Sequence, residues 1–292
     1  MTISRDEIQK SATAYHTVGD VEMVNVDGVS CAVWRAGSGE KTLVMIHGNS
    51  ACKEVFFNQM QAMSESGYNC LAIDLPGHGG TSDAASPETQ YTIGGYALLI
   101  KRVLDALEVT NYTVLGWSLG GHIGLEMAGR GFDLAGLMIT GTPPCGPGPA
   151  EVMDAFLPVE AGAVTMAAEA TDAQLQAYAK AVYGTLDPLP EFFVDAARRT
   201  DGIARATMGA NIIAGEEGCH QRTVAAGWAK PMAVGHGRLD PFISFEYLQS
   251  VNFGNLFDNE IHVFENSGHA PFLECPDEFN TFVSRFLKAV YA

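Results

Sequence analysis

Strand-like apolar runs alternate with helix-like segments along most of this chain, and this alternation constrains the fold more than any other feature. Four apolar runs end in glycine, proline or serine, as buried strands often do: TLVMIHG (42–48), NCLAIDLPG (69–77), TVLGWS (113–118) and AGLMITGTPP (135–144). Segments with the helical spacing of apolar residues lie between them, among them TIGGYALLIKRVLDAL and LGGHIGLEMAGRG. Such alternation over short connections is typical of a parallel sheet with helices on both faces. The sequence therefore predicts an α/β fold with a mostly parallel central sheet.

The alternation stops at Pro143-Pro144 and resumes at Pro231. Only helical patterns occur between these points, including TDAQLQAYAKAVYG, in which Thr171 and Gln174 are spaced as a capping box. The strand patterns PMAVGHGRLD and NEIHVFENSGH then return, and a final helix pattern follows. Because two strands are too few to fold alone, we expect one core from residues 1–143 and 231–292, with a helical cap inserted over 144–230. The first 20 residues look like an extension ahead of a hairpin.

Composition narrows the class of partner. The chain has 292 residues, of which 47% are hydrophobic, and this is enough for one core with an insertion. Its net charge of −17 disfavours nucleic acid and anionic lipid as partners, so a small-molecule substrate is expected. The sequence lacks a leader-like apolar segment, a run of about 18 apolar residues and a CxxC pair, which together predict a cytoplasmic protein with free thiols. The oligomeric state is left open.

The segment GWSLGG places Ser118 between glycines, where a strand pattern passes into a helix pattern. A serine on such a sharp turn is lifted above the carboxyl edge of the sheet, and Gly116 and Gly120 let strand and helix approach closely. The backbone N–H of Leu119 opens the helix and faces the place where an oxyanion would form. The alternative is a helix-capping serine, but the flanking patterns favour a nucleophile.

A serine nucleophile needs a base, and the base needs an acid that orients it. His269 follows the last strand pattern in ENSGHAPF, and Asp240 ends another in GHGRLDPF. The chain order Ser118, Asp240, His269 is the order that α/β-hydrolases use. The other candidates for the base or the acid are expected to have structural roles, or have no recognisable catalytic partner in the sequence. They are Asp74, His47, His78, His122, His236, His16, His220 and His262. Of these, His47 and His78 are expected to shape loops, and His122 to pack.

A second oxyanion donor is expected from the loop after the first long parallel strand, which reads His47-Gly48-Asn49-Ser50. We predict that the N–H of Asn49 is this donor; its side-chain amide is a further candidate for a substrate contact. Trp117, beside the nucleophile, is also a candidate substrate contact. The sequence has no His-x-His-x-Asp-His cluster of the kind that metallo-β-lactamase-type lactonases carry, so neither a metal nor another cofactor is expected.

Taken together, IHGN, DLPGHG, GWSLGG, GRLDPF and SGHAPF resemble the α/β-hydrolase superfamily along nearly the whole chain. Three longer stretches are similar to its metal-independent N-acyl-homoserine lactonases: GWSLGGHIGLEMAGR with GLMITGTPP, RTDGIAR, and VNFGNLFDNEIHVFENSGHAPF. The resemblance implies oxyanion donors at Asn49 and Leu119 and a substrate-contacting cap tyrosine at Tyr178. A glutamate can replace Asp240 in that group, and either carboxylate would serve. The cap around 145–170 matches least.

This resemblance implies a serine hydrolase that opens the lactone ring of N-acyl homoserine lactones. A general carboxylesterase or a C–C bond hydrolase on the same triad is the alternative, and a slow-turnover ligand receptor on this scaffold is another. Enzymes that use an aspartate in place of Ser118, such as haloalkane dehalogenases, are disfavoured. Apolar cap residues are candidates for an acyl-chain tunnel or for core packing; they are Met153, Phe156, Leu157, Met166, Phe192 and Phe193.

Overall fold

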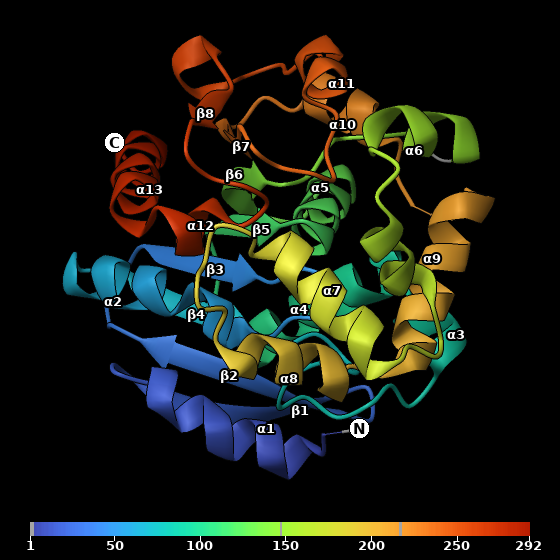
Figure 1. Cartoon of the computed structure of the whole chain (residues 1–292). Helices are drawn as coiled ribbons and strands as arrows, with labels where there is room; N and C mark the ends of the chain where they lie inside the picture. Colours follow the sequence, from blue (N-terminus) through green and yellow to red (C-terminus); the bar gives the residue numbers. More distant parts are fainter. Residues whose placement is uncertain (1–2, 147, 216–217) are drawn as a thin grey trace.

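The computed structural model describes residues 3–146, 148–215 and 218–292. These residues form an eight-stranded sheet with the order β1-β2-β4-β3-β5-β6-β7-β8 (Figure 1). The strands are β1 (Asp20–Val26), β2 (Val29–Ala36), β3 (Thr42–Ile46), β4 (Asn69–Ile73), β5 (Tyr112–Trp117), β6 (Leu134–Thr140), β7 (Met232–Gly237) and β8 (His262–Phe264). The pairs β1–β2 and β2–β4 are antiparallel, and the other pairs are parallel. The predicted α/β fold with a mostly parallel sheet is confirmed.

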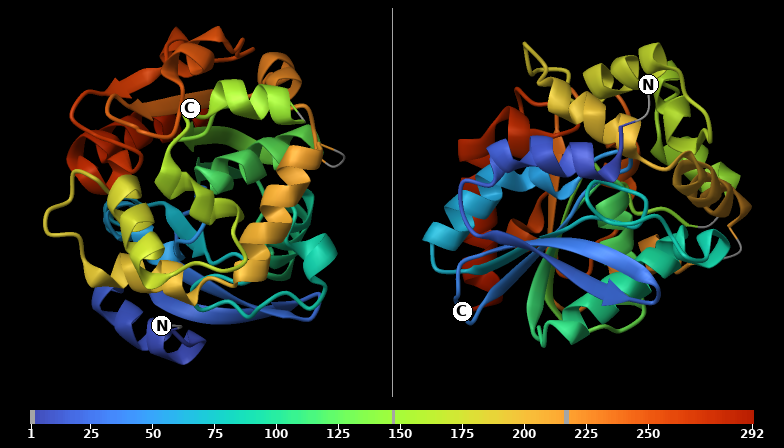
Figure 2. Two further views of the ribbon diagram at one scale, coloured as in Figure 1. Left: turned by 45° about the vertical axis from the view of Figure 1, so that its right-hand side comes forward. Right: turned by 90° about the horizontal axis from the view of Figure 1, so that it is seen from below.

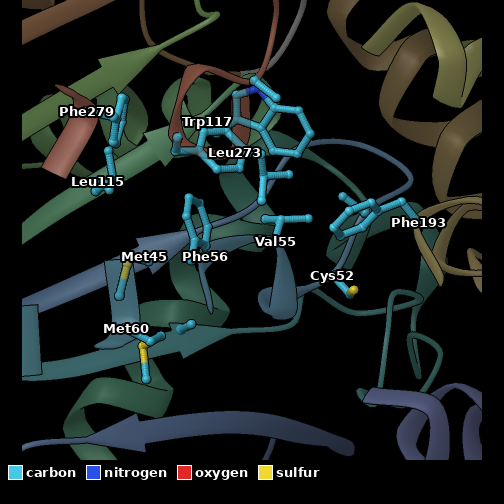
Figure 3. Packing of buried hydrophobic residues seen from close by; sticks show 14 of the residues in the cluster. Met45, Cys52, Val55, Phe56, Met60, Leu115, Trp117, Phe193, Leu273 and Phe279 are labelled. Atoms are coloured by element: carbon cyan, nitrogen blue, oxygen red, sulfur yellow. The ribbon is translucent and has the colours of Figure 1, made fainter. Parts of the chain in front are cut away.

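Side chains alternate between the two faces of the sheet, and each face has its own apolar core. On β3, Leu43 and Met45 belong to one cluster, whereas Val44 and Ile46 belong to the other. This period of two explains why the strand is apolar throughout: both of its faces are buried. Figure 3 shows the first cluster, where Met45 lies among side chains of β5 and of the segments around Phe56.

Helices cover both of these faces. The first cluster receives α2 (Phe57–Glu65) and α13 (Pro276–Val290), while α4 (Ile93–Ala106) and α5 (Leu119–Gly129) contribute to the second. The shorter helical segments lie in the connections; they are η1 (Thr13–Tyr15), η2 (Lys53–Phe56), α3 (Pro87–Gln90), α11 (Phe245–Ser250), η4 (Phe257–Asn259) and α12 (Pro271–Glu274). Among the residues that the structure describes, no helix is both long enough and apolar enough to cross a membrane.

The segment after β6 is helical, as its pattern predicts. It forms α6 (Pro149–Ala155), η3 (Glu160–Met166), α7 (Asp172–Val182), α8 (Glu191–Arg199), α9 (Gly202–Ala214) and α10 (Gln221–Gly227). Thr171 and Gln174 form the expected capping box at the start of α7. The elements η3, α7, α8 and α9 pack on one another, and together with α6 they are called the cap below; α10 packs against α5. The predicted insertion over 144–230 thus includes one helix that packs with the core.

The N-terminal segment contains a helix that the sequence patterns did not reveal. Helix α1 (Arg5–Ala12) begins with a capping box formed by Ser4 and Glu7. It buries Ile8 and Ala12, and the side chain of Gln9 donates a hydrogen bond to the carbonyl oxygen of Gly80. In Figures 1 and 2 this helix lies beside α8. The extension therefore joins the core to the cap.

Candidate active site

Ser118 lies between the end of β5 and the start of α5, in a backbone conformation that L-residues rarely adopt. Its φ is 52° and its ψ is −117°. A Cβ atom at Gly116 would lie 2.3 Å from the carbonyl oxygen of Gly120, and one at Gly120 would lie 2.0 Å from that of Ile46. Both positions therefore require glycine for the turn to form. The geometry is that of a nucleophile elbow, as predicted.

Trp117 precedes the elbow and points away from Ser118, because successive side chains of a strand face opposite sides. Its side chain is 1% exposed, packs against Phe272 and does not line the cavity described below. Its Nε1–H donates a hydrogen bond of 2.8 Å to the carbonyl oxygen of His269. Trp117 therefore does not take the expected place of a substrate contact. It anchors the loop that carries His269 instead.

His269 and Asp240 meet at the carboxyl edge of the sheet. The distance between His269 Nδ1 and Asp240 Oδ2 is 2.8 Å, and Asp240 Oδ1 accepts the backbone N–H groups of Phe242 and Ile243. Because the carboxylate accepts, Nδ1 of His269 carries the proton and Nε2 is left free to accept one. His269 and Ser118 line the same cavity, although no hydrogen bond between them is present. The structure thus brings the three predicted triad residues together.

The backbone N–H groups of Asn49 and Leu119 flank Ser118 from the loop after β3 and from the start of α5. Neither donates a hydrogen bond to another residue that the structure describes. Two unpartnered N–H groups beside a nucleophile are the requirement for an oxyanion hole. The side chain of Asn49 is occupied, since its Nδ2 donates to the carbonyl oxygen of Thr165 and its Oδ1 accepts from Ser50. This side chain therefore ties the loop after β3 to η3.

Tyr178, on α7, reaches the same loop. Its hydroxyl donates a hydrogen bond of 3.1 Å to the carbonyl oxygen of Asn49, and its ring lines the cavity. Burial raises the pKa of the phenol, so the hydroxyl stays a donor at neutral pH. In this structure Tyr178 thus contacts the loop after β3, and the sequence carries no signal for this contact.

A cavity of about 370 Å³ lies above Ser118, between the core and the cap. Apolar side chains form most of its wall, among them Phe156, Leu157, Met166, Val182, Met208, Ile212 and Phe242. Three of the six apolar cap residues singled out in the sequence, Phe156, Leu157 and Met166, line it. Of the others, Phe192 and Phe193 are buried in the core cluster, and Met153 is 77% exposed. An apolar chain next to a reactive carbonyl is the kind of ligand that such a wall accepts.

The remaining polar residues at this edge hold loops. Asp74 accepts hydrogen bonds from the backbone N–H and the Nζ of Lys53 and from the N–H of Gly80, and His47 Nε2 accepts from the N–H of Leu75. Burial lowers the pKa of His47, which keeps its ring neutral. Among the described residues, no group of three or more His, Cys, Asp or Glu side chains could hold a metal ion.

His122 packs against Phe156, as expected, but it also lines the cavity. It lies one turn beyond Ser118 on α5, is 6% exposed and lines the cavity, and its Nδ1 is 2.8 Å from Oε1 of Gln221. Burial lowers its pKa to about 4. The pattern LGGHIG carries no signal for this polar contact, because Gln221 lies 99 positions further along the chain. The contact of His16 has no signal in the sequence either: its Nε2 lies 2.9 Å from Oε1 of the buried Glu54.

Comparisons with known proteins support the fold described above. The model of the alpha/beta hydrolase family matches residues 43–282. Two solved structures of the N-acyl homoserine lactonase AidH have TM-scores of 0.88 and 36% identity over 93% of this chain. One is a serine-to-glycine mutant complexed with N-hexanoyl homoserine lactone, of which 98% is covered, and the other is complexed with N-butanoyl homoserine, with 97% covered.

Curated relatives match over shorter stretches. The 2-succinyl-6-hydroxy-2,4-cyclohexadiene-1-carboxylate synthase of Salmonella agona is 34% identical over 113 residues, which are 36% of this chain and 40% of that protein. The dihydrolipoyllysine-residue acetyltransferase component of the acetoin cleaving system of Cupriavidus necator is 26% identical over 136 residues, 43% of this chain and 35% of that protein. The chain thus spans less than half the length of these curated relatives.

Proposed function

Because the chain belongs to the alpha/beta hydrolase family, we propose that it is a metal-independent serine hydrolase that opens the lactone ring of N-acyl homoserine lactones. One observation carries the proposal: a single cavity combines Ser118, His269 and two unpartnered N–H groups with a mostly apolar wall. A neutral ester with an acyl chain fits this combination. AidH, which is similar to this chain over nearly its whole length, is an N-acyl homoserine lactonase.

The proposed reaction begins at Ser118. Its Oγ attacks the lactone carbonyl while Nε2 of His269 takes the hydroxyl proton, and Asp240 stabilises the imidazolium that forms. The N–H groups of Asn49 and Leu119 stabilise the negative charge on the carbonyl oxygen. When the tetrahedral intermediate collapses, the ring oxygen leaves as an alcohol with the proton from His269. An ester between Ser118 and the acyl homoserine remains.

Hydrolysis of this ester completes the cycle. The alcohol stays attached to the acyl group through the opened ring, so it could close the ring again unless water reacts first. His269 takes a proton from water, the hydroxide attacks the ester, and Ser118 leaves with the proton. The product is N-acyl homoserine, the same class as the N-butanoyl homoserine in one AidH structure. Direct attack by an activated water, without an acyl-enzyme, gives the same product. Loss of the lactone would quench quorum signalling.

The nucleophile is tested by replacing Ser118 with Ala. We expect kcat/KM for a lactone substrate to fall at least about a thousandfold, because one triad member is lost. The matched control is Ser66→Ala, at an exposed position on the surface, which should keep the wild-type rate. A serine-directed phosphonate should label the wild type and the control but not the Ser118 variant, and EDTA should leave the rate unchanged. A folded Ser118→Ala enzyme that keeps more than about a tenth of the activity would refute the proposal.

A further inference from the structure

His122 presents a polar atom to a part of the cavity wall that is otherwise apolar. It follows Ser118, the residue before α5, by four positions, and both residues line the active-site cavity. Its ring is 6.0 Å from that of Phe156, and Val152, Met208 and Ile212 line the same cavity. The polar groups of Thr165 and Tyr178 in this lining already donate to carbonyl oxygens. His122 plays no part in the proposed mechanism.

The hydrogen bonds around His122 fix which of its nitrogens carries the proton. The backbone N–H of Cys145 can only donate, and it donates to Oε1 of Gln221 at 3.4 Å. This identifies the side-chain atom of Gln221 as its oxygen, which can only accept. The same oxygen lies 2.8 Å from Nδ1 of His122, so Nδ1 must be the donor. In a neutral ring Nε2 is then a bare acceptor.

The ring is neutral and Nε2 is available. Burial lowers the pKa of His122 to about 4, so the imidazole is uncharged at neutral pH. Nε2 makes no hydrogen bond to a residue that the structure describes, and it is not among the fully buried polar atoms that lack a partner. It therefore borders accessible space. The ring lines two spaces, the active-site cavity and a smaller pocket beside Gln221. Because Nδ1 faces Gln221, Nε2 on the other side of the ring faces the active-site cavity. A free acceptor in a mostly apolar wall favours a ligand that donates a hydrogen bond.

We infer that His122 Nε2 accepts a hydrogen bond from a hydroxyl group on the acyl chain of the substrate, and that the enzyme therefore prefers 3-hydroxyacyl to 3-oxoacyl homoserine lactones. This inference rests on the proposed function and names the substrate class of the same site. Residues four apart on a helix are separated by about 6 Å along the axis. The third carbon of the acyl chain is five bonds from the lactone carbonyl, also about 6 Å in an extended chain. A 3-oxo group would place its own lone pairs against Nε2.

The test compares substrates within each variant. Three N-acyl homoserine lactones of one chain length are used, with a 3-hydroxy, a 3-oxo or an unsubstituted chain. For the wild type we expect kcat/KM to be about tenfold higher for the 3-hydroxy than for the 3-oxo substrate, the effect of one neutral hydrogen bond. His122→Phe, which keeps an aromatic ring but no acceptor, should bring this ratio close to one. His122→Gln, whose amide can also donate, should favour the 3-oxo substrate relative to the wild type. A general loss of activity cancels in the ratio.

Binding separates this inference from the proposed function. Calorimetry with Ser118→Ala, and with this change combined with His122→Phe, measures affinity for the 3-hydroxy and 3-oxo lactones without turnover. If the wild type opens no lactone but Ser118→Ala prefers the 3-hydroxy ligand and the double variant does not, the proposed reaction is wrong and the inference stands. If the lactones are opened with a ratio that His122→Phe leaves unchanged, the function stands and the inference is overturned. Absence of both turnover and binding overturns both.

Discussion

The backbone at Ser118 is strained for any residue with a Cβ atom, because its φ of 52° and ψ of −117° lie outside the regions that L-residues favour. Strain of this kind costs about 1–3 kcal/mol and persists only when the surrounding structure enforces it. Here the close approach of β5, α5 and the loop after β3 enforces it, since the glycines at 116 and 120 have no room for a side chain. Ser118 thus faces the cavity at a cost in stability.

Comparing two variants at this position tests the strain. Ser118→Ala keeps a Cβ atom and its strain, whereas Ser118→Gly removes both. Both variants should be inactive, but we expect the glycine variant to be more stable by about 1 kcal/mol, after allowing for the greater entropy of glycine in the unfolded chain. Urea unfolding of the two proteins measures the difference. An alanine variant that is as stable as the glycine variant would show that the elbow stores no strain.

Tyr178 offers a second test at the residue scale. Its hydroxyl donates to the carbonyl oxygen of Asn49, whose N–H is the proposed oxyanion donor. Tyr178→Phe keeps the ring but frees the loop, so we expect kcat/KM to fall roughly ten- to a hundredfold, with part of the loss in kcat. The Tm should change little, because only one hydrogen bond is removed. Phe242→Leu, in the same wall, is a control for packing. Unaltered efficiency of Tyr178→Phe would remove this residue from the site.

The elements were predicted well where their signals are local. β3, β4, β5 and β6 follow the apolar runs, and α4 and α5 follow the helical spacings between them, because burial on a sheet imposes the period of the strand or helix on the sequence. Helix α1 was missed, since its amphipathic face is short and contains only Ile8 and Ala12 as buried residues. The packing of α10 on α5 was missed as well, because it depends on tertiary contacts that no pattern within α10 encodes.

In the candidate site, too, the features with a local signal could be predicted, and those that depend on long-range contacts could not. Ser118, Asp240 and His269 each follow a strand, and the carboxyl ends of parallel strands meet at one edge, so their convergence could be predicted. The partners of Trp117, Tyr178 and His122 could not, because each makes its hydrogen bond to a residue at least 99 positions away. Long-range contacts of single side chains leave no periodic signal.

At the element scale, the contact between α5 and β3 can be tested at Gly120. A Cβ atom there would lie 2.0 Å from the carbonyl oxygen of Ile46, which is backbone and cannot move aside. We expect Gly120→Ala to lower the free energy of unfolding by more than about 3 kcal/mol or to prevent folding. Gly227→Ala, at the end of α10 where a Cβ atom meets nothing within 4 Å, is the control and should be neutral or slightly stabilising. Similar stability of the two variants would contradict the close packing.

For the whole molecule, buried neutral histidines make folding sensitive to acid. Burial lowers the pKa of His122 from 6.5 to about 4 and lowers that of His47 and His78 as well. Below pH 6.5 the unfolded chain binds protons that the folded protein does not, so stability is full above this pH and declines as the pH falls towards 4. For His122 alone the loss is on the order of 3 kcal/mol, at about 1.4 kcal/mol per pH unit.

The variant His122→Phe should therefore lose less stability than the wild type between pH 7 and pH 4. Urea unfolding at several pH values in this window measures both curves, and the gap between them should change in favour of the variant as the pH falls. Parallel curves for His122→Phe would mean that His122 is not held neutral by the fold.

The central claim is that this molecule adds water across the lactone bond of an N-acyl homoserine lactone, and a mass spectrum of one such lactone after incubation with the protein tests it most directly. The account predicts that the mass of the lactone increases by one water, that the acyl chain stays attached, and that Ser118→Ala does not produce this change. An unchanged lactone, or cleavage of its amide bond to release a free fatty acid, would contradict the account.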